Sequence, residues 1–296
     1  MNFNHDLRIS VIIPYHSTHK HLYRCVNSVI NQSYKPIEII LVNDACKEKL
    51  QFEKFISTDI KILKHDVIVN SGPAAARNIG LKKSKGNYIA FLDSDDFWGA
   101  DKLKHQVESI QENGCGDNLV IVSPVTIVQN GKVLGHRFPI LGDDKKSRLR
   151  LFKGPFLSLG STALFNKKLI RRVGYQNPRL RIYEDYEWQI RMVCDFDIKF
   201  IRSSRADVYI EKRKRTHKKG HLKSNHQALT SCIKKNQNFK GHLMRYITAG
   251  YFLDLAVSDL NQKSYFSMIF NLIISFLIVP RVSIHISKFW MRRNPN

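Results

Sequence analysis

The chain has 296 residues, of which 43% are apolar, and this is enough for one large α/β domain or for a domain with an appendage. Lysine and arginine outnumber aspartate and glutamate by 48 to 25, and the formal charge of +23 points to an anionic partner such as nucleic acid, anionic lipid or a phosphorylated substrate. Five cysteines without paired spacing indicate neither a disulfide framework nor a zinc site, and the N-terminus lacks the features of a signal peptide, so we expect a protein of the reducing cytosol.

Strands and helices alternate through the first half of the chain. Residues 9–13 form a continuous apolar run before Pro14, which is typical of a buried parallel strand. Apolar residues at helical spacing then predict an amphipathic helix over 18–32. The same reasoning predicts three more strands and two more helices, over 37–42, 60–63 and 88–92 and over 73–83 and 101–112. This alternation predicts an α/β fold with a doubly wound, mostly parallel sheet flanked by helices.

The second half has a less regular pattern. A hairpin is expected from residue 119 onward, with its two strands joined by the Asn130-Gly131 turn. The further expected elements are a strand over 161–165, a helix over 184–194, strands over 198–201 and 208–210, and helices beyond residue 225. We therefore expect one domain over 1–222 and a C-terminal helical region over 223–296.

The C-terminal region contains a strongly apolar segment, residues 266–279, which stops at Pro280 and is shorter than the roughly 20 residues of a spanning helix. The residues that follow it include Phe289, Trp290 and four cations: Arg281, Lys288, Arg292 and Arg293. This combination predicts a segment that lies in an anionic membrane surface. A buried helix at an oligomer interface and a true span that extends to Ile286 are the alternatives.

Polar residues follow three of the expected strands at the point where each strand ends. These residues are Tyr15 after Pro14, Asp44, and the run Asp93-Ser94-Asp95-Asp96. The carboxyl ends of parallel strands meet at one edge of a sheet, which is where such sheets bind ligands. Ionised carboxylates this close repel one another unless a cation compensates. A simpler interpretation is that Asp95 or Asp96 caps the next helix.

Four ordered segments carry a resemblance to a known family. They are SVIIPYH (10–16), SVINQSYKPIEIILVNDA (28–45), NSGPAAARNIGLKKSKGNYIAFLDSDDFW (70–98) and YEDYEWQIRM (183–192). In these segments the chain resembles the family 2 inverting glycosyltransferases, which adopt the GT-A fold and use nucleotide-diphosphate sugars. The resemblance covers about the first two-thirds of the chain.

The resemblance implies a nucleotide site at the strand ends. Asp44 matches the acidic residue that binds the base, and a carboxylate can accept the N3–H of uracil. Pro14 and Tyr15 match the rim beside the nucleotide. The sequence departs from the family pattern at His16, where Asn is frequent, and at Ala45-Cys46, where Gly-Ser is common.

The family's Ala-Arg-Asn motif matches Gly72, Arg77, Asn78 and Gly80 at the start of a helix. A helix N-terminus and the fork of Arg77 both favour a diphosphate. Arg77 has a second possible role, which is to hold Asp93 or Asp95 in place.

Asp93-Ser94-Asp95 matches the family's Asp-x-Asp motif, in which the first carboxylate reaches the ribose and the second a divalent cation. Hard cations such as Mn²⁺ or Mg²⁺ suit carboxylates together with substrate phosphates. The resemblance implies His217 as a further metal ligand, with His221 as second choice. The basic residues around His217 are an alternative site for a lipid-linked pyrophosphate acceptor.

Glu184-Asp185 matches the motif that supplies the catalytic base. Adjacent helical residues diverge by about 100°, so only one of them faces the acceptor. The match aligns Asp185 with the base, and Glu184 is interpreted as structural. The implied reaction is an in-line displacement with inversion, in which Asp185 takes the proton from the acceptor hydroxyl.

The expected function is therefore transfer of a sugar from a nucleotide-diphosphate donor, a UDP-sugar, to a saccharide or lipid-linked saccharide. We expect this in bacterial surface-polysaccharide synthesis, at the inner face of the cytoplasmic membrane. A nucleotidyltransferase or other metal-dependent phosphate enzyme would explain Asp93 and Asp95 but not Glu184-Asp185. Nucleic-acid binding rests on net charge alone, and no recognised binding module supports it.

Overall fold

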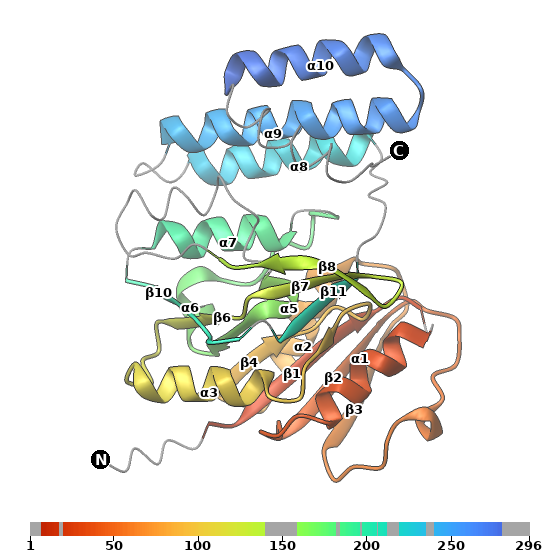
Figure 1. Cartoon of the computed structure of the whole chain (residues 1–296), viewed down its shortest axis with the longest axis vertical. Helices are drawn as coiled ribbons and strands as arrows, with labels where there is room; N and C mark the ends of the chain where they lie inside the picture. The colour runs from red at the N-terminus through yellow and green to blue at the C-terminus, as the bar shows by residue number, and fades with distance from the viewer. Residues whose placement is uncertain are drawn as a thin grey trace. The chain divides into compact units, whose positions relative to one another are not determined.

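Strand β1 (Ile9–Tyr15) runs through the interior of a seven-stranded sheet with the order β10-β6-β9-β4-β1-β2-β3 (Figure 1). The computed structural model describes residues 7–17, 20–139, 159–181, 184–195, 197–205, 207–211, 219–234 and 240–279. The other strands of this sheet are β2 (Glu38–Asp44), β3 (Lys61–Val67), β4 (Tyr88–Phe91), β6 (Leu119–Val122), β9 (Ala163–Asn166) and β10 (Lys199–Arg202). All neighbours are parallel except β9, which is antiparallel to both β4 and β6. The predicted α/β fold with a mostly parallel sheet is confirmed.

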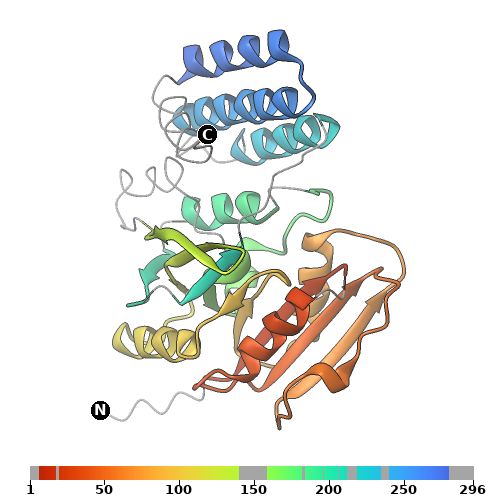
Figure 2. The ribbon, with the colours of Figure 1, turned by 45° about the vertical axis from the view of Figure 1, so that its right-hand side comes forward.

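Helices cover both faces of this sheet, because side chains of β1 alternate between them. Ile9, Val11 and Ile13 share one buried apolar cluster with residues of α1 and α3. Ile12 points to the opposite face and packs against Gly80 of α2. Figure 2 shows α1 lying along one face of the strands. The helices of this part are α1 (Lys20–Ile30), η1 (Phe52–Lys54), α2 (Pro73–Lys83), α3 (Lys102–Glu112), α5 (Leu159–Thr162), α6 (Leu169–Val173) and α7 (Glu184–Cys194).

A smaller, four-stranded sheet has the order β5-β11-β7-β8. Its strands are β5 (Phe97–Trp98), β7 (Val125–Gln129), β8 (Lys132–Arg137) and β11 (Val208–Glu211). Strands β7 and β8 form the expected hairpin, and both turn residues have positive φ, 50° at Asn130 and 78° at Gly131, as a tight two-residue turn requires. The expectation of a single strand over 119–128 was wrong. The chain leaves one sheet after β6 and enters the other at β7, and Pro124 between them lacks the N–H that a continuous strand would need.

The remaining predicted elements agree with the structure apart from their ends. Helix α2 has the predicted bounds, whereas β1 continues past its predicted end through Pro14 to Tyr15. Proline is tolerated there because the pairing of β1 with β4 ends at Ile12, so that Pro14 pairs with β2 alone.

The chain divides into two compact units, Met1–Arg179 with Glu184–Arg213 and Leu180–Tyr183 with Lys214–Asn296. The second unit contains α8 (Lys219–Lys234), α9 (Lys240–Asn261) and α10 (Tyr265–Ile278), and α9 packs against both of the others. The predicted domain boundary at 222/223 lies inside α8. Among the described residues, no helix is long and apolar enough to cross a membrane.

Candidate active site

The carboxyl ends of β4, β1 and β2 meet at one edge of the large sheet, since these three strands are adjacent and parallel. Tyr15 of β1 pairs with Asn43 of β2, so the two strands end side by side. Just beyond β1, a ring nitrogen of His16 lies 2.5 Å from the carbonyl oxygen of Asp44. The sequence prediction that the first two polar strand ends lie together is therefore confirmed.

Asp44 joins the end of β2 to the start of α2. Its two carboxylate oxygens accept hydrogen bonds from the backbone N–H groups of Ser71 (2.7 Å) and Gly72 (2.8 Å). Gly72 is the N-cap of α2 and has φ of 84°, a conformation that glycine adopts readily and other residues rarely. Asp44 is 5% exposed, and each carboxylate oxygen has a second lone pair for another donor. Ala45, the next residue, has φ of 60°, a left-handed conformation that glycine adopts more readily than alanine.

Pro14 and Tyr15 lie beneath this rim. Tyr15 is 2% exposed, and its ring belongs to the apolar cluster between the sheet and α1. Burial, and after it the nearby carboxylate of Asp66, raise the pKa of the Tyr15 hydroxyl above its usual value. Packing of Tyr15 on a nucleotide base stays a prediction.

Arg77 of α2 connects two parts of the site. Its Nη2 donates to Oδ1 of Asp93 (2.6 Å), and its Nη1 donates to Oε1 of Glu184 (2.9 Å) and to Oε1 of Gln176 (3.2 Å). Burial alone would lower the pKa of Arg77, but attraction by Asp93 and Glu184 outweighs it and leaves that pKa raised. Arg77 is therefore a buried, permanently charged group that holds Asp93, which was one of its two predicted roles.

Glu184 and Asp185 begin α7, where negative side chains are favoured by the helix dipole. Burial raises the pKa of Glu184 to about 7, although Arg77 acts in the opposite direction. The repulsion of Asp185 adds to this rise. Asp185 itself is half-buried, whereas Glu184 is buried against Arg77 as expected for a structural residue.

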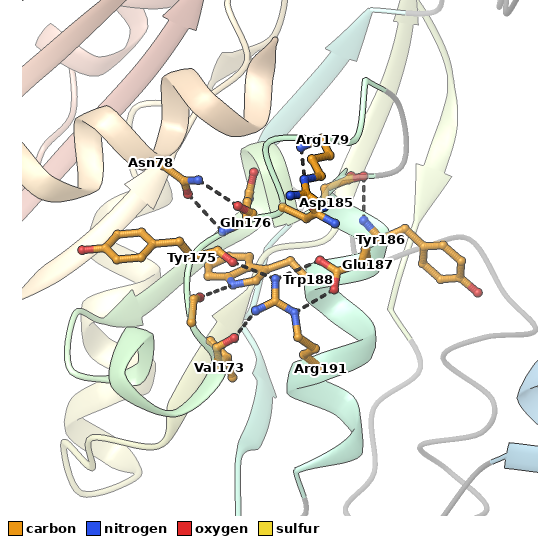
Figure 3. Close-up of polar contacts among 12 residues, drawn as sticks. Asn78, Val173, Tyr175, Gln176, Arg179, Asp185, Tyr186, Glu187, Trp188 and Arg191 are labelled. Carbon is orange, nitrogen blue, oxygen red and sulfur yellow. Dashed lines mark hydrogen bonds and ion pairs between the residues drawn. The ribbon is translucent and has the colours of Figure 1, made fainter. Parts of the chain in front are cut away.

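The position of α7 is fixed by a set of polar contacts around its first turns (Figure 3). The indole N–H of Trp188 donates to the carbonyl of Gly174 (2.9 Å). Arg191 pairs with Glu187 and also donates to the carbonyl of Val173. These contacts anchor the helix that carries Asp185 (Figure 3).

The turn that carries the Asp-x-Asp motif is supported by hydrogen bonds that involve Ser161 and the buried Asp96. Ser161 donates from Oγ to Oδ2 of Asp96 (2.6 Å) and accepts from the backbone N–H of Asp93 (3.1 Å). Burial, followed by repulsion from Asp95 and Asp93, raises the pKa of Asp96 well above its usual value. The capping interpretation was wrong: the N-cap of α3 is Asp101.

Sequence reasoning missed Gly160 and Ser161 of α5. A Cβ at Gly160 would lie 2.9 Å from Oδ2 of Asp93 and 3.1 Å from Nη2 of Arg77, so only glycine leaves this pair in place. Ser161 lies 68 positions from Asp93 and 65 from Asp96, so no local pattern in the sequence joins these residues.

Asp93 and Asp95 offer oxygen ligands that suit a hard divalent cation. The side chain of Asp93 is 35% exposed, Ser94 and Asp95 are half-buried, and the backbone carbonyl of Asp95 accepts a hydrogen bond from Arg24 (3.1 Å). Two carboxylates with substrate phosphates are a common ligand set for Mg²⁺. Within the described ranges, no three His, Cys, Asp or Glu side chains gather as a metal cluster, and the predicted ligand His217 lies outside those ranges.

A cavity of about 770 Å³ lies at the other end of the large sheet. Its lining includes Arg8, Asn87 and Lys168, which belong to the amino end of β1, the start of β4 and the residues after β9. The carboxylates of the candidate site do not line this cavity.

A mostly parallel sheet flanked by helices, with carboxylates at the ends of its adjacent parallel strands, defines the structural class of the protein as α/β. Residues 10–174, more than half of the chain, match the model of glycosyl transferase family 2. The chain belongs to this family.

Relatives of the chain include two bacterial proteins. One is the putative teichuronic acid biosynthesis glycosyltransferase TuaG of Bacillus subtilis, 37% identical over 109 residues, which are 36% of this chain and 43% of TuaG. The other is the UDP-Glc:alpha-D-GlcNAc-diphosphoundecaprenol beta-1,3-glucosyltransferase WfgD of Escherichia coli, 30% identical over 132 residues, which are 44% of this chain and 50% of WfgD. The matched segments thus span half or less of the length of these relatives.

Among solved structures, S. aureus TarS 1-349 in complex with UDP-GlcNAc superposes with a TM-score of 0.64 at 20% identity. The superposition covers 93% of this chain and 82% of the TarS chain. This likeness establishes a shared fold.

Proposed function

We propose that the protein is an inverting glycosyltransferase that moves a sugar from a UDP-sugar to a hydroxyl group of a saccharide or lipid-linked saccharide. The observation that carries this proposal is the guanidinium of Arg77, which contacts Asp93 of the proposed donor motif and Glu184 beside the proposed base, Asp185. A nucleotidyltransferase on a similar sheet would have no use for a second acidic pair on α7. The relatives TuaG and WfgD support a place in bacterial surface-polysaccharide synthesis.

The donor half of the site is formed by residues at the strand ends. Asp44 would accept the N3–H of uracil with a lone pair that its bonds to Ser71 and Gly72 leave available. Pro14 and Tyr15 would lie beside the base, Asp93 would reach the ribose, and Ser94 would be a further donor contact. Asp93 and Asp95, with His217, would hold Mn²⁺ or Mg²⁺, which when bound supplies positive charge to the departing diphosphate.

The acceptor half depends on Asp185. Its carboxylate takes the proton of the acceptor hydroxyl while that oxygen forms a bond to C1 of the sugar. The bond from C1 to the diphosphate oxygen breaks on the opposite side, and the nucleotide leaves with the bonding electron pair, so that the configuration at C1 inverts. Glu184 is less suited to this role because its carboxyl group is buried against Arg77.

The acceptor and its location follow from the same reasoning. WfgD is named for an acceptor on diphosphoundecaprenol, and a lipid-linked acceptor of this kind would be met at a membrane. We infer that the protein works at the inner face of the cytoplasmic membrane as a peripheral protein.

The test begins with a donor screen, in which nucleotide sugars with Mn²⁺ are added and the thermal unfolding midpoint is measured. One stabilising UDP-sugar is expected, and stabilisation by free nucleoside triphosphates alone would favour the nucleotidyltransferase. Asp185→Asn should then abolish transfer and leave the donor affinity within about twofold. The control is Asp195→Asn, which makes the same change just after the other end of α7. Asp195 forms an ion pair with Arg172, and this variant should retain activity. Retained turnover in Asp185→Asn would remove this residue as the base.

A further inference from the structure

Helix α10 of the second unit has its apolar side chains on the outside. Eight of its 14 residues are large, apolar or aromatic, and exposed: Tyr265, Phe266, Ile269, Phe270, Leu272, Ile273, Phe276 and Leu277. Phe266 is 87% and Leu277 72% exposed. At 100° per residue these eight positions occupy one continuous side of the helix. In a helix that only completed a water-soluble bundle, the apolar side chains would face inward and the polar side chains would face water.

The inward side of α10 carries a stripe of polar groups, and these groups are paired. Ser267 and Asn271 donate to Oδ2 of the buried Asp259 of α9, at 2.7 and 2.8 Å. Ser275 donates to the carbonyl oxygen of Ala249 of α9 at 2.9 Å. The three donors are spaced by four residues and form one stripe along the helix. These bonds, with the half-buried Met268, Ile274 and Ile278, hold α10 against α9, and the eight exposed apolar side chains take no part in this packing.

The charge of the same region indicates what covers the apolar side. Residues 214–296 contain 14 lysines and arginines and two aspartates. Four of these cations, with Phe289 and Trp290, follow α10 in the sequence after Pro280. Aromatic and cationic residues beside an apolar helix face are the pattern of a segment at an anionic lipid surface.

We propose that α10 is a membrane-binding helix that lies parallel to an anionic bilayer, with the side chains from Tyr265 to Leu277 inserted at the boundary of headgroups and acyl chains. Fourteen residues span about 21 Å along a helix axis, less than the roughly 30 Å of a bilayer core, so α10 lies in one leaflet. The polar stripe that binds Asp259 keeps the helix in this orientation before it meets the membrane. This inference deepens the peripheral membrane location of the proposed function by naming the segment and the lipid chemistry, and neither the donor nor the reaction enters it.

The test measures binding of the full chain to vesicles of phosphatidylglycerol and phosphatidylcholine by flotation, with pure phosphatidylcholine as the neutral comparison. We expect binding to the anionic vesicles, and a fall of at least tenfold in the partition coefficient in the double variant Phe270→Asp/Ile273→Asp. Val133→Asp, which changes a 57% exposed residue of β8 in the other unit, is the matched control and should bind as the unchanged chain does.

Two results would overturn the proposal. One is unchanged partitioning of the double variant. The other is a dimer in light scattering that the double variant converts to a monomer without any vesicle binding, because the face would then be covered by a second copy. Circular dichroism checks that the double variant keeps its helices. Transfer to a soluble acceptor should be unchanged in that variant, so failure here is separable from failure of the proposed reaction.

Discussion

Replacing Glu184 with glutamine should change how the stability of the protein depends on pH. In the folded chain one guanidinium, that of Arg77, faces the carboxylates of Asp93 and Glu184, and Asp185 adds a further negative charge nearby. With Glu184 protonated, Arg77 and Asp93 balance one another. Ionisation of Glu184 therefore adds an uncompensated charge to a buried site.

The magnitude follows from the pKa of Glu184, which burial raises from an ordinary 4.5 to about 7. Between these values the folded chain keeps a proton that the unfolded chain has released, so the free energy of unfolding falls as the pH rises. The contribution of protonated Glu184 to the free energy of unfolding is fully present below pH 4.5 and is lost as the pH rises through 7. A difference of about 2.5 units corresponds to about 3 kcal/mol at most.

The assay is urea unfolding at intervals from pH 5 to pH 8, followed by tryptophan fluorescence, on the unchanged chain and on Glu184→Gln. The amide keeps the shape and an oxygen for Arg77 but does not titrate. Because all other titrating groups are shared, the difference between the two curves isolates Glu184. We expect similar stabilities at pH 5 and a variant that is more stable by up to about 3 kcal/mol at pH 8. Parallel curves, or an unchanged chain that gains relative stability with rising pH, would mean that Arg77 keeps Glu184 ionised throughout.

Two further predictions concern the turns of the site. Ser161→Ala removes the hydroxyl that donates to the buried Asp96, so it should lower the free energy of unfolding in urea by about 1–3 kcal/mol. It should also weaken donor binding, measured by calorimetry. A loss of stability below about 0.5 kcal/mol would mean that another group supports Asp96. Ala45→Gly should relieve the strain of the left-handed backbone at this residue, about 1–2 kcal/mol. The greater conformational entropy of glycine in the unfolded chain offsets about 0.4–1 kcal/mol of this gain. The urea midpoint should therefore rise, and a lower midpoint would contradict the strain at Ala45.

The fold of the first half could be predicted from the sequence because its signals are local. Buried parallel strands appear as apolar runs, and α2 starts at Pro73 and ends near two lysines. Pro124 marks the split between β6 and β7 in the sequence, but the sheet that each strand joins could not be predicted, because both strands are short and apolar and only their partners differ. The antiparallel pairing of β9 with β4 and β6 joins segments far apart in the sequence, and no local pattern encodes it.

The sequence could predict the position of those site residues that lie at the ends of parallel strands. Asp44 and Asp93 end up at one edge because parallel strands share their direction. The bond from Arg77 to Glu184 joins residues 107 positions apart, and the sequence left two roles open for Arg77. Ser161 carried no signal, since a serine is common in turns and strands alike.

Arg77 gives the site a connection that neither half has alone. On one side it fixes Asp93 of the proposed donor motif, and on the other it fixes Glu184, which shares the first turn of α7 with Asp185. Ordinary surface ion pairs contribute little because water screens them, but this guanidinium is only 4% exposed, so loss of either carboxylate changes the field at the other. A protonated Glu184 removes one source of repulsion from Asp185. The charge state of Glu184 therefore affects two things: how Arg77 holds Asp93, and the electrostatic field at Asp185. For this reason the titration of Glu184 is the most informative measurement on the site.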